Sequence, residues 1–335
     1  MKNVIKNRFR YFSISAVLIL LSLSMMIFGK LNLGIDMTGG ISSEYSYSTI
    51  DQDLSTTNLA ELADKFIHNG EKIINATSIY KISGEDKVAV VVGFDNTLEE
   101  KELNSLKNEF RGQVFSSLQT TGTDLVETKY TNIGKSFGDY IKNTAILTLI
   151  IAIAAIALYI TWAFSGVVSG INFVSFSSIT IVTLFHDIVI ATGLYILTSA
   201  FFPEFKIDTF FVTALLTILW YSINDTIVIF DRIRSNLKDI NKKWNTLEKA
   251  IEKSIGESVT RSIYTSVTLL FVLVTIFFFG PESISGFTLV MIFGTIVGTY
   301  SSIFIASPLL YQLNKDKKIQ KYVKAEYNPE DKIVV

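Results

Sequence analysis

The sequence has 335 residues, none of them cysteine and only two of them histidine. Without cysteine, disulfide bonds, thiolate zinc sites, iron–sulfur clusters and cysteine nucleophiles are excluded. The chain also lacks a GxxxxGK phosphate loop, an HExxH helix and a Ser-His-Asp order, which argues against nucleotide and zinc hydrolases. Charged residues make up only 18% of the chain and the net charge is -1, so no basic field points to nucleic acid.

Hydrophobic residues make up 49% of the chain, including 25 phenylalanines, and the mean hydropathy is +0.40. This composition is typical of a membrane protein. Six apolar stretches are long enough to cross a membrane as helices, which takes about 20 residues. They cover residues 11–28, 144–164, 171–197, 209–230, 262–279 and 285–310. The first lacks the cleavage pattern of a signal peptide, so we interpret it as a retained anchor, with a signal peptide as the alternative.

Basic residues give the expected orientation, because Lys and Arg concentrate in cytoplasmic loops. They cluster before the first stretch, between the fourth and fifth, and after the sixth. With six spans, these three places lie on one side, so both termini are predicted to be cytoplasmic in a multi-pass protein of the cell membrane. The loop at residues 164–170 carries no basic residue and gives this orientation no support.

The predicted chain has four parts. Residues 1–29 hold the N-terminus and the first span, residues 30–140 an extracytoplasmic domain, residues 141–310 spans two to six, and residues 311–335 a charged cytoplasmic tail. Near residues 236–258, Leu247, Ile251, Ile255 and Val259 recur every fourth residue. This spacing predicts an amphipathic helix at the cytoplasmic membrane interface, with a helix packed on a soluble domain as the alternative.

The domain at residues 30–140 alternates between strand and helix patterns. Strands are predicted at residues 41–48, 74–83, 87–94 and 124–133, with a turn at Gly84, Glu85 and Asp86. Helices are predicted from an Asn58 cap through His68 and at residues 98–118. The order βαββαβ predicts a ferredoxin-like α+β sandwich.

Asp225 is the most unusual residue, because a carboxylate near the bilayer centre costs about 2.5 to 3.5 kcal/mol. If span four ends near Asp231, Asp225 lies roughly 9 Å inside that end, and Arg261 opens span five from the same side. Opposite charges at similar depth neutralise each other, and a proton on Asp225 would release Arg261. The pattern indicates a proton-linked switch; a carboxylate that merely joins two helices is an equal alternative.

Other polar and small residues lie in the later spans. His186 and Asp187 are adjacent in span three, and we expect them on different helix faces as packing and hydrogen-bonding groups. A metal site is disfavoured, since no further His or Cys completes a coordination shell. Small residues in spans five and six indicate closely packed helices. These are Ser262, Thr265, Ser266, Gly286, Gly294, Gly298, Ser301 and Ser302.

Several segments together resemble the SecF family of the SecDF protein-export complex, within the resistance-nodulation-division (RND) superfamily. The span-four segment is the most specific, and the matching pieces stand in family order from about residue 30 to 311. They read LNLGIDMTGG, NIGKSFGDYI, FHDIVIATGLY, YSINDTIVIFDRIRSN, ESVTRSIYTSVT and GTIVGTYSSIFIASPLL. The resemblance implies six transmembrane helices that form half of an RND-type bundle.

The family's function then implies the chain's partners and its coupling ion. A SecF subunit pairs with SecD on the SecYEG translocon, in membrane lipid, and proton flow helps to pull the preprotein outward. No enzyme activity and no cofactor are implied; the proton is the expected coupling ion, with sodium as an alternative. Other functions that remain are an ion-coupled small-molecule exporter subunit and a scaffold subunit without ion coupling.

Carried over by motif, Asp225 is similar to the family's proton-carrying aspartate and Arg261 to its basic partner. Asn224 and Thr226 are then neighbouring polar groups of the path, and His186, Asp187 and Glu257 are expected around it. The chain departs from the family pattern at Lys135, Gly256 and Glu257, where the family has Pro, Asn and Gln. Glu257 is therefore an extra carboxylate, expected either to perturb the Asp225 and Arg261 pair or to lie in cytoplasmic water.

Overall fold

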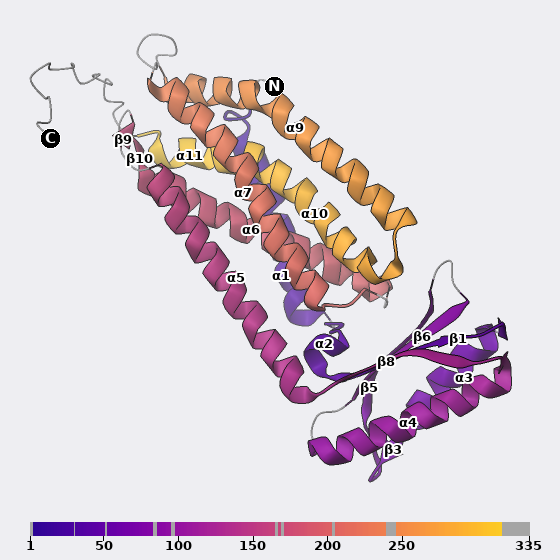
Figure 1. Cartoon of the computed structure of the whole chain (residues 1–335). Helices are drawn as coiled ribbons and strands as arrows, with labels where there is room; N and C mark the ends of the chain where they lie inside the picture. Colours follow the sequence, from indigo (N-terminus) through magenta and orange to yellow (C-terminus); the bar gives the residue numbers. More distant parts are fainter. Residues whose placement is uncertain are drawn as a thin grey trace, which may run out of the picture.

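Six long helices form a bundle in the computed structural model, and a small sheet with two helices lies at one end of it (Figure 1). The structure describes residues 3–29, 31–50, 52–82, 86–94, 98–164, 167–168, 171–202, 205–238 and 246–316. Within these ranges, six helical segments are long and apolar enough to cross a membrane. They are α1 (Arg8–Phe28), α5 (Lys135–Ala163), α6 (Phe173–Phe201), α7 (Thr209–Lys238), α9 (Leu247–Phe279) and the composite segment Ser285–Asn314. Each of the six apolar stretches predicted as spans is therefore a long apolar helix.

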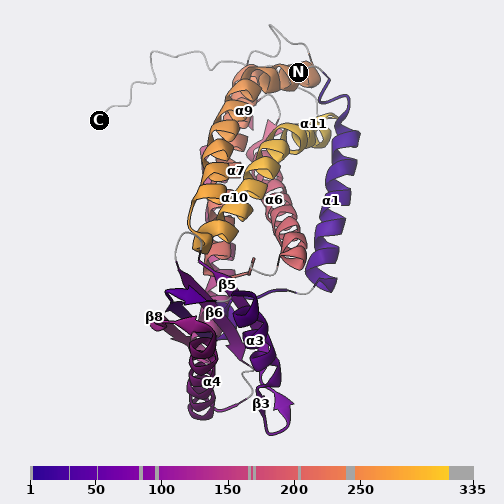
Figure 2. The same ribbon diagram turned by 90° about the vertical axis from the view of Figure 1, so that its right-hand side faces the viewer.

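The amphipathic segment and span five are one continuous helix, α9, and not two elements as the sequence suggested. Leu247, Ile251, Ile255 and Val259 are all buried, so the predicted apolar face is real. That face packs on the other helices, which lets the helix continue without a break into the next span. In Figure 2, the first part of α9 lies across the end of the bundle and the rest runs along it.

Helix α7 also runs further than predicted, to Lys238. The charged residues after Phe230 find partners on neighbouring helices: the Arg232 Nε donates to Glu257 Oε2 at 2.5 Å, and Arg234 Nη1 donates to the Ala163 carbonyl at 3.2 Å. These bonds extend α7 where its apolar pattern stops. The segments 239–245 and 317–335, which hold part of the predicted loop and tail, lie outside the described residues.

The last span is interrupted by a π-helical turn. Helix α10 (Ser285–Ser301) passes through η2 (Ser302–Ala306) into α11 (Ser307–Asn314). Pro308 has no N–H to donate to Phe304 and its ring crowds that carbonyl, which disfavours a regular helix here. The Ser307 hydroxyl instead donates to the Ser302 carbonyl at 3.2 Å.

The smaller part is a four-stranded antiparallel sheet in the order β5-β6-β1-β8. Helices α3 and α4 pack on one face of the sheet, where they enclose a second hydrophobic core (Figure 2). The strands are β1 (Gly40–Ser46), β5 (Ile74–Lys81), β6 (Lys87–Phe94) and β8 (Val126–Ile133), and the helices are α3 (Gln52–Lys65) and α4 (Glu100–Thr121). The remaining short elements are α2 (Ile35–Thr38), β2 (Thr49–Ile50), β3 (Ile67–His68), β4 (Glu71–Lys72), β7 (Gly122–Thr123), β9 (Val167–Val168), β10 (Ile171–Asn172) and η1 (Glu282–Ile284).

Two predicted details of this part are wrong. Helix α3 begins at Gln52 and contains Asn58, so Asn58 does not cap it, and the helix ends at Lys65, leaving His68 in β3. The residues before Leu59 are mostly polar, so the sequence has no helical spacing of apolar residues that would predict the first part of α3. Of the predicted turn, Gly84 and Glu85 lie outside the described residues.

The bundle and the sheet are joined by the segment that follows α1. Leu33 pairs with Ile207 in a parallel bridge, Gly34 N donates to the Ile207 carbonyl at 2.8 Å, and Ile207 N donates to the Asn32 carbonyl at 2.8 Å. The next residue, Asp208, caps α7 by accepting the Phe211 N–H at 2.8 Å. The chain leaving the first span is thus fixed to the start of α7.

Candidate functional site

Asp225 lies on α7 where that helix meets α9 and α10, and one of its carboxylate oxygens is buried without a hydrogen bond. Among the described residues, Asp225 Oδ2 accepts no hydrogen bond, and the buried Ser262 hydroxyl also has no partner. The hydroxyls of Ser262 and Ser302 and the charge of Arg261 interact electrostatically with the carboxyl. Because α7 continues to Lys238, Asp225 is about 20 Å from the end of the helix at 1.5 Å per residue.

The other residues predicted for the relay occupy different environments. Arg261 and Asn224 are exposed on the outer surface of the chain, and Arg261 is in the middle of α9, not at its start. No ion pair within the described part of the chain joins Arg261 to Asp225. Thr226 is 1% exposed, and its hydroxyl shares a hydrogen bond with the Ser302 hydroxyl at 2.9 Å.

Glu257 is held by other cations. Its Oε2 accepts from Arg232 at 2.5 Å and from the Asn236 amide at 3.1 Å, and its Oε1 lies 3.4 Å from Lys253 Nζ. Neither Asp225 nor Arg261 is among these partners. The extra carboxylate of the sequence thus belongs to a cluster that joins α7 to α9.

His186 and Asp187 act together, contrary to the expectation that they lie on different helix faces. The Asp187 carboxyl is 0% exposed, and its Oδ1 is 2.8 Å from His186 Nδ1. Both side chains are buried inside the bundle, as are most residues of the α6 span. The second imidazole nitrogen, Nε2, is 3.0 Å from the Ser15 hydroxyl of α1.

Two serines from other helices complete the surroundings of Asp187. The Ser222 hydroxyl of α7 donates to Asp187 Oδ2, and the Ser301 hydroxyl of α10 donates to the same oxygen at 2.8 Å. Because a serine side chain is short, α7 and α10 must lie close together for these hydroxyls to reach Asp187. Gly298 allows this close approach, since a Cβ at Gly298 would lie 3.1 Å from Ser222 Cβ. The predicted close packing of small residues is confirmed for α10, while Thr265 of α9 is exposed.

Sequence reasoning did not find this network. Ser301 stood out as a small residue within an apolar span and Ser222 lies in the most specific family segment, but nothing in a single sequence pairs them with Asp187 across helices. Ser15 gave no signal at all, since a serine in an apolar helix commonly bonds to its own backbone. Only the crossing of α1, α6, α7 and α10 brings the four side chains together.

Two ionisable groups lie just outside the bundle, at the junction with the sheet. Burial raises the pKa of Asp208 to about 6, with the nearby Asp36 carboxylate adding to the effect and the Phe211 N–H opposing it. Burial lowers the pKa of Lys206 to about 8. Asp36 itself accepts a hydrogen bond from the Thr209 hydroxyl at 2.9 Å.

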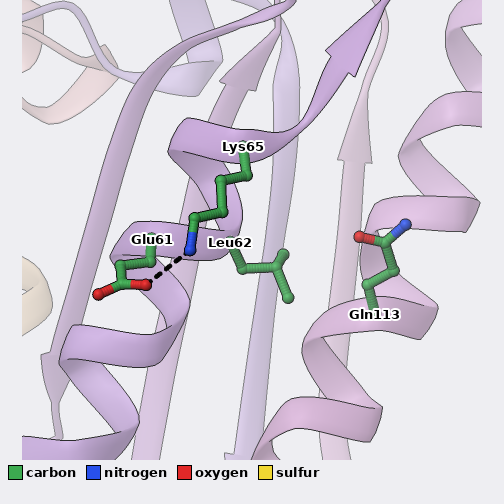
Figure 3. A pocket seen from close by; sticks show the side chains of 4 residues that line it. All are labelled: Glu61, Leu62, Lys65 and Gln113. Carbon is green, nitrogen blue, oxygen red and sulfur yellow. Dashed lines mark hydrogen bonds and ion pairs between the residues drawn. The ribbon is translucent and has the colours of Figure 1, made fainter.

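The surface of the sheet's helices has a shallow hollow of about 340 Å³ between α3 and α4 (Figure 3). Its lining residues are Glu61, Leu62, Lys65 and Gln113, and Lys65 forms an ion pair with Glu61 at 2.8 Å. This pair is one helical turn apart and faces solvent, as on many helix surfaces. The hollow offers no convergent set of polar groups for a ligand.

Comparison with known proteins gives consistent matches. The model of the family described as "Protein export membrane protein SecD/SecF, C-terminal" matches residues 113–316. The chain is 34% identical over 329 residues to protein translocase subunit SecF of Endomicrobium trichonymphae, which covers 96% of this chain and 95% of the relative. It is 32% identical over 305 residues to that of Helicobacter pylori strain J99, covering 90% of this chain and 84% of the relative.

Among solved structures, the crystal structure of SecDF, a translocon-associated membrane protein from Thermus thermophilus, matches with a TM-score of 0.70 at 23% identity. The match covers 93% of this chain and 38% of that one. At this identity the likeness shows the fold alone. The present chain spans about two fifths of the length of that longer polypeptide.

Proposed function

The chain belongs to the SecF family of protein export membrane proteins, and we propose that it uses the proton-motive force to assist translocation. In this proposal Asp225 carries the proton, and Arg261 is the cation that its charge attracts when the proton leaves. The observation that carries the proposal is the Asp225 carboxyl: within the described residues its buried Oδ2 accepts no hydrogen bond of regular geometry, and the nearby hydroxyls of Ser262 and Ser302 and the charge of Arg261 favour its ionised form. A structural carboxylate would be expected to have both oxygens bonded.

The energetics allow a proton to drive a conformational change. A proton that crosses a membrane potential of 100 mV releases about 2.3 kcal/mol. Protonation of Asp225 removes its attraction for Arg261, which lies on a different helix, so the relative stability of two α7–α9 arrangements changes. No resident cofactor is needed for this chemistry. The proton is proposed as the coupling ion, with sodium as the alternative that experiment must exclude.

The partners follow from the chain's exposed surfaces and its relatives. Trp220 and Tyr264, at 67% and 70% exposed, lie beside the exposed Arg261 and Asn224 on the α7 and α9 surface. An aromatic and charged surface next to the relay suits a second membrane subunit, and we propose that SecD covers it. The SecYEG translocon, the preprotein and membrane lipid complete the proposed assembly.

The four-stranded sheet supports a ferredoxin-like domain on the extracytoplasmic side. Its order β5-β6-β1-β8, with α3 and α4 as the two crossovers, matches a split βαβ arrangement. The positive residues of the N-terminus and of residues 232–253 favour a cytoplasmic location for the opposite end of the bundle. We therefore propose a multi-pass cell-membrane protein with both termini in the cytoplasm.

The test is Asp225→Asn, co-reconstituted with SecD and SecYEG in vesicles, with preprotein release followed under a proton gradient. We expect the gradient-dependent part of release to fall at least tenfold in the variant. Asp231→Asn, which neutralises an exposed carboxylate further along the same helix, is the control and should keep most of the activity. Normal gradient-dependent release by Asp225→Asn would exclude the relay and favour a scaffold subunit.

The coupling ion is tested in the same vesicles. We expect release to follow the pH gradient at constant sodium, since a carboxyl beside hydroxyls and an arginine is built to exchange a proton. A response to sodium alone would contradict the assignment of the proton. Transport of a small molecule without preprotein would instead indicate an exporter.

A further inference from the structure

Asp187 is a buried carboxyl with no full positive charge beside it except the one that His186 can carry. Among the described residues, neither Lys nor Arg forms an ion pair with it, and the carboxyl is 0% exposed. An isolated carboxylate at this depth is strongly disfavoured. One proton on the His186 and Asp187 pair would make the pair as a whole neutral.

The surrounding donors fit the pair in its imidazolium–carboxylate form. Asp187 Oδ2 accepts from the hydroxyls of Ser222 and Ser301, and Oδ1 faces the imidazole Nδ1. The remaining imidazole nitrogen reaches the Ser15 hydroxyl at 3.0 Å, which can accept its proton. A carboxylate accepts at both oxygens and an imidazolium donates from both nitrogens, so every position has a matching group.

Helices α7 and α10 connect the hydrogen-bond network of Asp187 to the Asp225 site. Ser301 directly precedes Ser302, which interacts electrostatically with Asp225 and shares a hydrogen bond with Thr226 at 2.9 Å. Ser222 is one turn before Asp225 on α7, and its carbonyl accepts from Ser302 at 3.5 Å. Asp187, which bonds to both α7 and α10, thus helps to fix the distance between these two helices near Asp225.

The π-helical turn makes that spacing adjustable. It begins at Ser302, where α10 departs from the regular helical ladder. A π turn is one residue wider than an α turn and can shift its register with local rearrangement of hydrogen bonds. Two carboxyls, Asp187 and Asp225, therefore interact with the start of one irregular turn, through Ser301 and Ser302.

We propose that His186 and Asp187 form a second protonatable pair, a positioning site whose proton content sets the α7–α10 spacing at Asp225. This inference rests on the proposed role of Asp225 as proton carrier. When the pair loses its proton, the imidazole no longer compensates the Asp187 carboxylate, which then holds the Ser222 and Ser301 hydroxyls more tightly. When the proton returns to His186, these bonds weaken and Ser302 is freed to move. The groups that face the pair are Tyr300 of α10 and Tyr11 of α1 near Ser15, and Asp225 of α7 one turn away.

The experiment compares Asp187→Asn with Thr180→Val in the full chain reconstituted with SecD and SecYEG. Thr180 is on the same helix and 1% exposed, but its hydroxyl bonds to the carbonyl of Phe176 in its own helix. Both variants replace a buried group by one of similar size. The readout is the pH at which gradient-dependent preprotein release is half-maximal, with thermal unfolding in detergent measured alongside.

We expect Asp187→Asn to move the half-maximal pH by about one unit, since it removes the carboxylate that holds the Ser222 and Ser301 hydroxyls and with them the surroundings of Asp225. Thr180→Val should leave that pH unchanged. Ser301→Ala, which keeps the charge and removes one donor to Oδ2, should shift the pH in the same experiment and serves if Asp187→Asn does not fold. An unchanged half-maximal pH in folded Asp187→Asn, or in Ser301→Ala in its place, would reduce the pair to a structural clamp.

The two hypotheses fail separately. An active Asp225→Asn contradicts the relay, whatever Asp187 does. An inactive Asp225→Asn combined with a wild-type pH profile in Asp187→Asn contradicts the positioning role alone.

Discussion

Gly294 of α10 lies directly against Ile218 of α7: a Cβ on Gly294 would come within 2.2 Å of Ile218 Cδ1. Ile218 is 0% exposed. The missing side chain at Gly294 is therefore what lets the two helices approach. Further along the same pair of helices are Ser222 and Ser301, whose hydroxyls both reach Asp187.

Gly294→Ala should destabilise the bundle by about 1 to 3 kcal/mol, because a methyl group inserted into a filled core forces its neighbours apart. Thermal unfolding in detergent measures the loss. Gly256→Ala is the matched control, since a Cβ at this helical glycine meets nothing within 4 Å. That control should be neutral or stabilising by up to about 1 kcal/mol, and equal effects of both variants would contradict the close-packing interpretation.

Asp208→Asn should change how stability depends on pH. The pKa of Asp208 is raised to about 6 from its ordinary value of 3.8, so the folded chain binds more protons than the unfolded chain between these values. Its contribution to stability is complete below about pH 4 and is lost as the pH rises through about 6. Asparagine still caps α7 but does not ionise.

The difference in unfolding temperature between Asp208→Asn and the wild type should therefore be smallest near pH 4 and grow in favour of the variant toward pH 7. Thr209→Ser, which keeps the hydroxyl that donates to Asp36, is the control and should follow the wild-type curve. A pH-independent difference for Asp208→Asn would show that burial does not perturb this carboxyl.

Glu257→Gln should leave the pH profile of translocation unchanged, because Glu257 is bonded to Arg232, Asn236 and Lys253 and not to Arg261. A stability loss of roughly 0.5 to 1 kcal/mol is expected for a partly exposed ion-pair cluster. Lys253→Met is a second variant, which removes the ion pair between Lys253 and Glu257 while keeping the carboxylate. A shifted half-maximal pH in Glu257→Gln would place this carboxylate in the relay after all.

The sequence by itself determined the class of the protein, the number of spans and the position of Asp225. Long apolar runs are unambiguous, since only a helix can satisfy its backbone inside a membrane, and a carboxylate in such a run is conspicuous. The strands were readable for a similar reason: residues 87–94 were predicted as a strand and β6 is Lys87–Phe94.

The tertiary structure decided which polar groups meet. His186 and Asp187 were assigned to separate faces because consecutive helical residues point about 100° apart, yet a helix surrounded by others buries both. The continuity of α9 and the extension of α7 depend on partners from distant segments, such as Glu257 for Arg232. Hydrogen bonds between helices are fixed by how the helices cross, and a pattern within one helix does not contain that information.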